Sequence, residues 1–364
     1  MEFTVYDLTS ASASSASAWR AADNATSHAA AYRHTFEQAA LADEGGLDTY
    51  FVTEHHFNGG FQVVPSPHLL VAALSQTTTR IRLGAMCTNL PLYHPVRLAE
   101  EIRMMDLLSQ GRLELGIGRG TAPHEQAGFG VAREETEALF EQSFELIRQL
   151  LVDGGVDKYD TGPWQGTGVS LTPDATQSPC PPLWMTANSE KSVRKAARLG
   201  LNLCTGFLDV EDTARTSKIY REEWQAVHPD EPVGKYGTLQ HIFVAETESE
   251  ARRLAQPHLQ DWLGAGRDAV VANKQSTAVD VGYEEHRQYF EKITRLSFDD
   301  AVERGRIIFG TPDQCAAQLL RKAEGGVQMF QGWFQFGGLD PEASNRSLQL
   351  FGEQVAPVVR AAGL

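Results

Sequence analysis

A glutamate and two histidines follow directly after a short apolar stretch near the N-terminus. Residues 50–52 read Tyr-Phe-Val, which favours a buried strand, and Glu54, His55 and His56 come next. Parallel α/β folds keep their chemistry where strands end and loops begin. Three interpretations are open at this point. These residues could bind a metal ion, exchange protons or hydrogen bonds with a bound cofactor, or simply hydrogen-bond to their own loop.

The composition is that of an ordinary globular protein with an acidic excess. Hydrophobic residues make up 42% and charged residues 22% of the 364 residues, and the formal net charge is −15. This charge disfavours partners such as nucleic acid or an anionic membrane. The sequence has no transmembrane-type apolar run, and its N-terminus lacks the pattern of a signal peptide. We therefore expect a cytoplasmic protein.

Strand-like and helix-like segments alternate along the chain. The eight expected strands are residues 3–8, 50–52, 81–88, 112–118, 183–187, 201–205, 239–246 and 327–336. The expected helices are residues 28–44, 66–78, 96–108, 134–151, 189–199, 211–227, 249–263, 311–323 and 341–361. Thr311 is expected to cap its helix, with Pro312 at the first helical position.

This alternation predicts an α/β fold of the (β/α)₈ TIM barrel type. Two excursions, residues 153–181 after strand four and residues 264–306 after strand seven, account for the length beyond a simple barrel. An open doubly wound sheet is the competing topology. It would normally split into halves, and no composition break marks such a boundary. We expect a single barrel domain over residues 1–364.

A glycine-rich run, Gly-Ile-Gly-Arg-Gly at residues 116–120, lies at the end of the fourth expected strand. It imitates a dinucleotide-binding fingerprint, but Thr121 stands where the last glycine is required. The run could let a flat ligand approach the backbone, with Arg119 as a donor to an anion. It could also be an ordinary turn.

Small polar residues join the fifth expected strand to its helix, over residues 186–192. The free N–H groups and the dipole of a helix N-terminus can bind an anion there. Ordinary N-capping by Asn188 or Ser189 explains the same residues equally well.

A metal site fits the sequence less well than a flat, phosphate-bearing ligand. A catalytic zinc site needs three protein ligands, and His94 is the one further candidate at an expected strand end. Adjacent histidines in a regular strand also point to opposite faces. The cysteines form no CxxC pair and indicate no disulfide or zinc framework. They are Cys87, Cys180, Cys204 and Cys315.

The sequence resembles the bacterial luciferase-like flavin-dependent monooxygenases. The matching runs are FVTEHHF at 51–57, LPLYHPVRLAE at 90–100, LLSQGRLELGIGRG at 107–120, residues 185–192 and FQFGGL at 334–339. The resemblance implies an α/β barrel that uses reduced FMN and O₂ through a flavin C4a-hydroperoxide to oxygenate a small organic substrate. It also implies a separate flavin reductase as a partner, and we expect a homodimer.

The resemblance also implies roles for individual residues. His55 matches the catalytic histidine, and Glu54 matches a carboxylate that lines the flavin site. Met86 and Cys87 fall where luciferases have a non-proline cis peptide beside the flavin ring. The remaining cofactor-binding candidates are the phosphate contacts Arg119, Ser189 and Ser192, the neighbouring Asn188, and an aromatic wall at Phe207.

Three positions depart from the luciferase pattern. Gly118 replaces a reactive cysteine, Glu137 replaces a second phosphate-binding arginine, and Ala122 replaces a bulky aromatic residue. Phosphate binding would then depend on Arg119, on the helix start or on Arg133, and light emission is not implied. Two other functions stay open: an F420-dependent dehydrogenase on the same barrel, and a non-catalytic flavin-binding subunit.

Overall fold

The structure is a computed structural model that describes residues 1–11, 24–58, 62–274 and 296–363. Internal contacts divide the chain into two compact units. Unit 1 comprises Met1–Asp48, Asn58–Val63 and Ala187–Leu364, and unit 2 comprises Thr49–Phe57 and Val64–Thr186.

Unit 2 is built on four parallel strands in the order β2-β3-β4-β7. Every residue of β2 and β4 is buried, as expected for parallel strands that are covered on both faces. Its strands are β2 (Thr49–Val52), β3 (Arg82–Asn89), β4 (Leu113–Gly118), β5 (Gly155–Asp160), β6 (Gln165–Ser170) and β7 (Leu183–Thr186). Its helices are α2 (Pro67–Leu74), η2 (Leu90–Leu92), α3 (Pro95–Leu108), α4 (Pro123–Gly128), η3 (Arg133–Glu135) and α5 (Thr136–Asp153).

Unit 1 is also built on parallel strands. Strand β11 lies between β1 and β9, and β8 and β10 both pair with β9. Its strands are β1 (Glu2–Asp7), β8 (Asn202–Gly206), β9 (Tyr236–Val244), β10 (Ile307–Gly310) and β11 (Met329–Trp333). Its helices are α1 (Asn24–Glu44), α6 (Glu190–Arg198), α7 (Val210–Val227), α8 (Glu248–Lys274), α10 (Phe298–Glu303), α11 (Pro312–Glu324), α12 (Pro341–Leu350), η4 (Phe351–Val355) and α13 (Ala356–Ala361).

Helix starts follow the chemistry of their cap residues. Thr311 accepts a hydrogen bond from the N–H of Gln314, and the side-chain Oε1 of Gln314 accepts one from the Thr311 N–H. Pro312 begins α11. The predicted cap is therefore confirmed. Asp209 caps α7 in the same way by accepting from the N–H of Asp212 at 2.7 Å.

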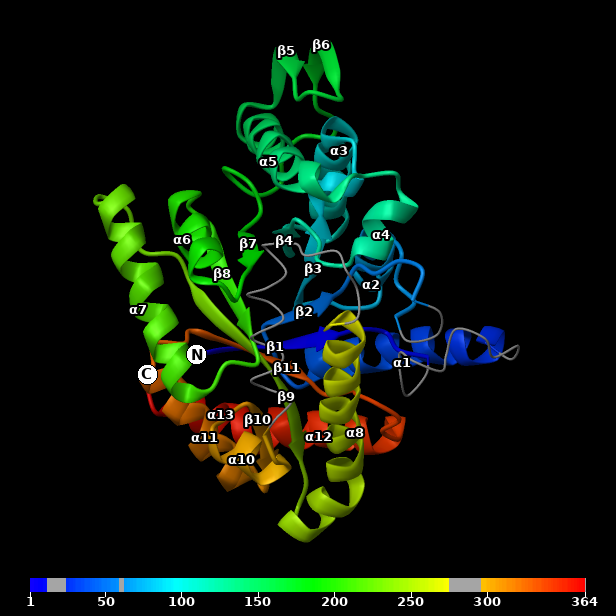
Figure 1. The fold of residues 1–364 in the computed structure, drawn as a ribbon, viewed down its shortest axis with the longest axis vertical. Helices are drawn as coiled ribbons and strands as arrows, with labels where there is room; N and C mark the ends of the chain where they lie inside the picture. Colours follow the sequence, from blue (N-terminus) through cyan, green and yellow to red (C-terminus); the bar gives the residue numbers. More distant parts are fainter. Residues whose placement is uncertain (12–23, 59–61, 275–295, 364) are drawn as a thin grey trace. The chain divides into compact units, whose positions relative to one another are not determined.

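The two predicted excursions need correction in detail. Residues 153–181 contain an antiparallel hairpin, β5–β6, which follows α5 in Figure 1. The helix predicted to end at Leu263 continues as α8 to Lys274 and so takes up the start of the 264–306 excursion. The short apolar run Ile307–Gly310 is an additional strand, β10, which the sequence reading missed. Residues 275–295, which hold much of the second excursion, lie outside the described residues. Residues 12–23, which include most of a run of Ser, Ala and Thr that the sequence predicts to be a loop over residues 9–18, also lie outside them.

Across the described part of the chain, we find no helix with the length and apolar character needed to cross a membrane.

Candidate functional site

His55 follows β2 and is tied to a carboxylate on α4. Its Nδ1 lies 2.9 Å from Oε1 of Glu125, and the same oxygen accepts the backbone N–H of His56 at 3.0 Å. The Glu125 side chain is buried, whereas 28% of the His55 side chain is exposed. Burial acts to raise the pKa of Glu125, but hydrogen bonds from His55 and the His56 N–H hold it below its ordinary value. An ionised Glu125 makes Nδ1 the donor and leaves Nε2 to act on a ligand.

His56 belongs to a second, fully buried pair. Its Nε2 lies 3.0 Å from Oε1 of Glu54, and Oε2 of Glu54 accepts the backbone N–H of Asn89 at 3.0 Å. The Tyr93 hydroxyl also bonds to Glu54, and burial followed by that carboxylate's charge raises the pKa of Tyr93. The two adjacent histidines thus hydrogen-bond to different carboxylates. Within the described residues, no group of three or more His, Cys, Asp or Glu side chains is arranged to hold a metal ion.

The peptide bond between Met86 and Cys87 is cis, at the position where the resemblance placed one. The pairing of β3 with β4 shifts register here, between Ala85 and Thr88. Burial raises the pKa of the Cys87 thiol to about 11, and the negative charge of Glu54 adds to this, while a hydrogen bond from Thr186 acts the other way. The thiol is therefore protonated at neutral pH.

The glycines of β4 make room for side chains of β3. A Cβ at Gly116 would lie 2.6 Å from Sδ of Met86, and one at Gly118 would lie 2.5 Å from Sγ of Cys87. Close approach was predicted for these glycines with a flat ligand as the approaching group. Within unit 2, the approaching groups are the side chains of Met86 and Cys87.

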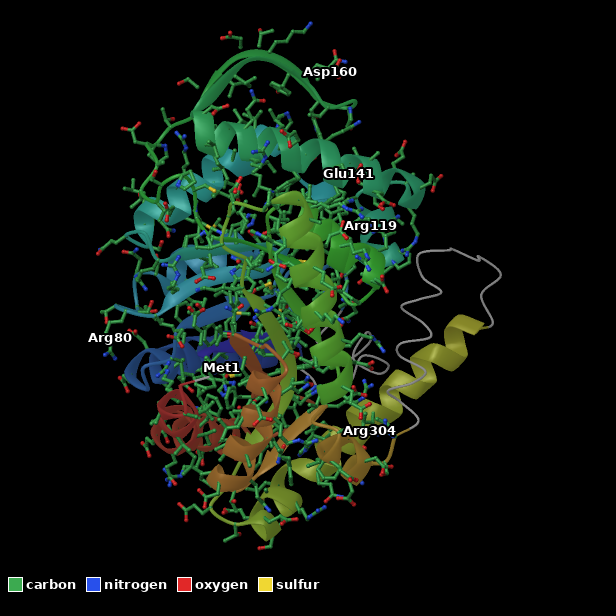
Figure 2. The ribbon with its side chains drawn as sticks, turned by 90° about the vertical axis from the view of Figure 1, so that its left-hand side faces the viewer. Met1, Arg80, Arg119, Glu141, Asp160 and Arg304 are labelled. Atoms are coloured by element: carbon green, nitrogen blue, oxygen red, sulfur yellow. The ribbon has the colours of Figure 1, made fainter. Side chains whose placement is uncertain are left out.

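Arg119 lies just beyond β4 and is partly exposed. Figure 2 shows it on the same side of unit 2 as Glu141 of α5. Its Nη1 lies 3.8 Å from Oε2 of Glu137, in the first turn of α5. Glu137 is the residue noted above as a departure from the luciferase pattern. Any anion that Arg119 binds would therefore compete with this carboxylate.

The predicted helix start lies in unit 1 and has the expected geometry. Ser189 caps α6, and its Oγ accepts the N–H of Ser192 at 3.3 Å and donates to Oγ of Ser192 at 3.0 Å. Asn188 uses Oδ1 to accept the N–H of Gly206, the last residue of β8, at 2.8 Å. Asn188 thus links two segments of unit 1, and Ser189 and Ser192 remain at the positive end of the α6 dipole.

Phe207 follows β8 in unit 1 and has a left-handed backbone with φ of +58°. Its ring stacks on His241, with centroids 5.0 Å apart and an interplanar angle of 25°. Burial lowers the pKa of His241 to about 3, so this imidazole is neutral. The ring of Trp333 stacks on His241 in turn, at 4.3 Å.

Within each unit, the structure brings part of the predicted set together. Unit 2 gathers Glu54, His55 and Cys87 around the ends of β2 and β3, and unit 1 holds Asn188, Ser189, Ser192 and Phe207 around the end of β8 and the start of α6. Two partners were missed by the sequence reading, Glu125 and Tyr93. A buried carboxylate in the short α4 helix offered no periodic signal, whereas Tyr93 stood inside the LPLYHPVRLAE run.

Residues 1–329 match the family model described as luciferase-like monooxygenase. The chain belongs to the luciferase-like monooxygenase family. The resemblance found in the sequence is thereby confirmed over nearly the whole chain.

Among luciferase-like relatives, the oxygenase component of a flavin-dependent trigonelline monooxygenase from Acinetobacter baylyi is 29% identical over 228 residues. That match covers 61% of this chain and 61% of the relative. The solved monooxygenase RslO1 from Streptomyces bottropensis is 26% identical, with a TM-score of 0.78, and the match covers 98% of this chain and 99% of that one. The predicted α/β fold with a closed barrel of eight parallel strands is confirmed.

Two more distant structures share the luciferase-like fold alone. The oxygenating constituent of 3,6-diketocamphane monooxygenase from Pseudomonas putida, in complex with FMN, is 19% identical with a TM-score of 0.76, covering 99% of this chain and 98% of that one. An F420-dependent secondary alcohol dehydrogenase is 17% identical with a TM-score of 0.72, covering 99% of both chains. The fold therefore serves both FMN and F420.

Proposed function

We propose that this chain is the oxygenase component of a two-component monooxygenase, which uses reduced FMN and O₂ to oxygenate a small organic substrate. The observation that carries the proposal is the His55–Glu125 pair at the end of β2, in a chain of the luciferase-like family. Bound reduced FMN would supply the electrons and the site of O₂ activation. The protein would supply binding, orientation and proton control.

His55 is the proposed catalytic residue. With Nδ1 held by Glu125, its Nε2 can hydrogen-bond to the flavin or move a proton to or from it. Glu125 is a positioning residue that sets the orientation and tautomer of the imidazole. Glu54 would line the flavin site indirectly, because both of its oxygens already accept hydrogen bonds from the protein.

Each unit, taken by itself, holds residues whose chemistry suits FMN. In unit 2, Arg119 suits the phosphate, and the backbone at Met86 and Cys87 suits the edge of the ring system. In unit 1, the α6 start at Ser189 and Ser192 suits the phosphate, with Asn188 bracing that segment, and Phe207 offers an aromatic face. We propose no metal.

A separate flavin reductase would supply the reduced FMN, since the sequence lacks a complete dinucleotide-binding fingerprint for a nicotinamide cofactor. Purified protein mixed with FMN and NADH or NADPH should therefore oxidise the nicotinamide slowly, and adding a flavin reductase should restore fast turnover. Rapid oxidation without the reductase would contradict the two-component proposal.

The assembly proposed is a homodimer. Leu69 on α2 and Met104 and Leu107 on α3 are apolar yet 74%, 55% and 51% exposed, and the two helices pack against each other within unit 2. Exposed apolar side chains on neighbouring helices suit burial against a second copy. Light scattering should give a dimer mass for the wild type and a shift toward monomer for Met104→Glu.

The deciding experiment is an anaerobic titration with reduced FMN and, separately, with reduced F420, followed by admission of O₂. Tight binding of reduced FMN and oxygen-dependent product formation support the proposal. Preference for F420 with oxygen-independent hydride transfer would establish the dehydrogenase alternative. Flavin binding without any turnover would establish an accessory subunit.

A further inference from the structure

The turn after β8 has a backbone that needs outside support. Phe207 has a φ of +58°, a region that costs a bulky residue about 1 kcal/mol or more. Its N–H donates to the carbonyl of Leu239 on β9 at 2.8 Å. This one bond fixes a single end of the turn, so the two carbonyls that follow must be held by other groups.

Three side chains donate to those two carbonyls. Nη1 of Arg306 donates to the Phe207 carbonyl at 2.8 Å. Nζ of Lys322 on α11 and Nε2 of Gln240 on β9 both donate to the Leu208 carbonyl, at 2.5 and 2.8 Å. Three separate segments of unit 1 thus hold the turn, and two of the donors are basic side chains.

Both basic side chains are buried, and Nζ of Lys322 also donates to the Thr213 hydroxyl at 3.2 Å. The exposed fraction is 2% for the Arg306 side chain and 0% for Lys322. Nη2 of Arg306 lies 3.1 Å from Oδ2 of Asp209 and 3.6 Å from Oδ2 of Asp212, so carboxylates at the start of α7 balance the charge. Burial lowers the pKa of Lys322 to about 7, with Asp209 opposing that shift.

Buried charges of this kind are poor stabilisers. Replacing them with apolar side chains of similar size is often neutral or even stabilising. Their presence around one turn therefore calls for a role other than stability. The conformation of this turn sets the direction of the Phe207 side chain, so the buried groups fix that direction. The Phe207 ring is partly exposed and stacks on His241.

We propose that Arg306 and Lys322 are positioning residues that hold the Phe207–Leu208 turn so that the Phe207 ring stacks on the bound flavin. This inference rests on the proposed function. It assigns a role in cofactor binding to two residues that act through the backbone and touch no cofactor themselves.

The first test separates positioning from stability. Lys322→Met keeps the side-chain volume and removes the charged donor. We expect a protein that is at least as stable at pH 6, yet binds both FMN and riboflavin about tenfold more weakly, because the ring contact and not the phosphate contact is affected. Arg346→Met, which removes an exposed arginine paired with Glu246 at 2.8 Å, is the matched control and should leave both affinities unchanged. Unchanged flavin affinity in Lys322→Met would overturn the inference.

The second test is a double-mutant cycle with Phe207→Leu, which removes the ring. If Lys322 acts through Phe207, the double variant should bind flavin no more weakly than Phe207→Leu alone. Arg306→Gln gives the same cycle should Lys322→Met fail to fold. Hydrogen exchange of residues 206–209 in the flavin-free protein should also speed up in Lys322→Met.

Additive effects in both cycles, or a Phe207→Leu variant that binds flavin normally, would overturn the inference while the proposed function stands. A wild-type protein that binds no flavin would instead overturn the proposed function itself. The outcomes of the two proposals are therefore distinguishable.

Discussion

Glu125 and His55 are 70 positions apart in the chain and share a 2.9 Å hydrogen bond in unit 2. The same Glu125 oxygen also accepts the His56 N–H, so one carboxylate fixes both the backbone after β2 and the imidazole that follows it. Because the hydrogen bonds from His55 and His56 keep the pKa of this buried carboxyl below its ordinary value, the carboxylate is ionised at neutral pH. His55 therefore has a defined orientation before any ligand binds.

Glu125→Gln keeps the size of this side chain and removes its charge. We expect product formed per FMN oxidised to fall about ten- to a hundredfold, because a neutral amide is a weaker acceptor than a carboxylate and holds the His55 imidazole less firmly. FMN affinity should stay within about threefold. The matched control is Glu101→Gln, which alters another histidine-bound carboxylate, on His68, and should leave the coupling near wild type. Wild-type coupling in both Glu125→Gln and Glu125→Ala would remove Glu125 from the mechanism.

His55→Ala tests the proposed catalytic residue. We expect a folded protein that binds FMN within about tenfold of wild type and loses about a hundredfold or more in product, with H₂O₂ released instead. His55→Asn should recover part of the loss if hydrogen bonding dominates, and little if proton transfer does. Product and H₂O₂ are measured under single turnover. Near-wild-type coupling in His55→Ala would end its assignment as catalytic.

Ser189→Asp tests whether the α6 start holds the FMN phosphate. Asp, Asn and Ser cap helices about equally well, so α6 should persist in each variant. A carboxylate facing a phosphate dianion should weaken FMN binding about tenfold or more, whereas riboflavin affinity should hardly change. Ser189→Asn is the neutral control. Equal losses for FMN and riboflavin would show that the phosphate binds elsewhere.

Lys322→Met should change stability in a pH-dependent way. The native pKa of Lys322 is about 7, mainly through burial, with Asp209 and Asp212 opposing the shift and Arg306 and Arg321 adding to it. An unfolded lysine titrates near pH ~10.4. Between these values the unfolded chain binds more protons, so the wild type gains stability as pH rises through the window, and below it the burial penalty is present in full.

The variant should therefore be more stable than wild type at pH 6, on the order of a few kcal/mol, with the gain shrinking by pH 9. Urea unfolding of both proteins at each pH measures the difference. A stability difference that is the same at both pH values would show that Lys322 titrates normally in the native state.

Gly118→Ala should destabilise unit 2 through one contact. The new Cβ would lie 2.5 Å from Sγ of Cys87, and overpacking of this kind costs about 1–3 kcal/mol. In a Cys87→Ala background the nearest remaining Cys87 atom, Cβ, is 3.6 Å away, so the same substitution should cost little. Thermal unfolding of the four proteins measures this. Equal losses in both backgrounds would place the clash elsewhere.

The barrel strands could be predicted because each is a short apolar run next to a turn or a helix signal. Strands β5 and β6 could not, since GVDKYD and QGTGVS are polar and mostly exposed, and they pair with each other alone. Strand β10 is only four residues long and lies beside a segment that showed no pattern. Local periodicity detects buried faces. Strands β5 and β6 are too polar, and β10 is too short, to give such a pattern.

The candidate site could be predicted only where a residue type stood at an expected strand end. His55 and Ser189 met that condition. Glu125 did not, because α4 has six residues and no apolar period, and its contact with His55 is set by the tertiary fold. The hydrogen bond from Arg306 to the Phe207 carbonyl could not be predicted for the same reason, since 99 positions separate the two residues.

The β5–β6 hairpin starts and finishes at one place, because the Leu171 N–H donates to the Gly154 carbonyl at 2.8 Å (Figure 1). Residues between Gly154 and Leu171 could therefore be deleted, or others inserted, without changing the distance between the segments that precede and follow the hairpin. The packing of Tyr159 and Trp164 on the His94 ring would be lost, together with the contacts of β5 with α5. The hairpin is therefore a suitable insertion site for a flavin reductase domain. Such a fusion would be one polypeptide with a high effective concentration of reduced flavin.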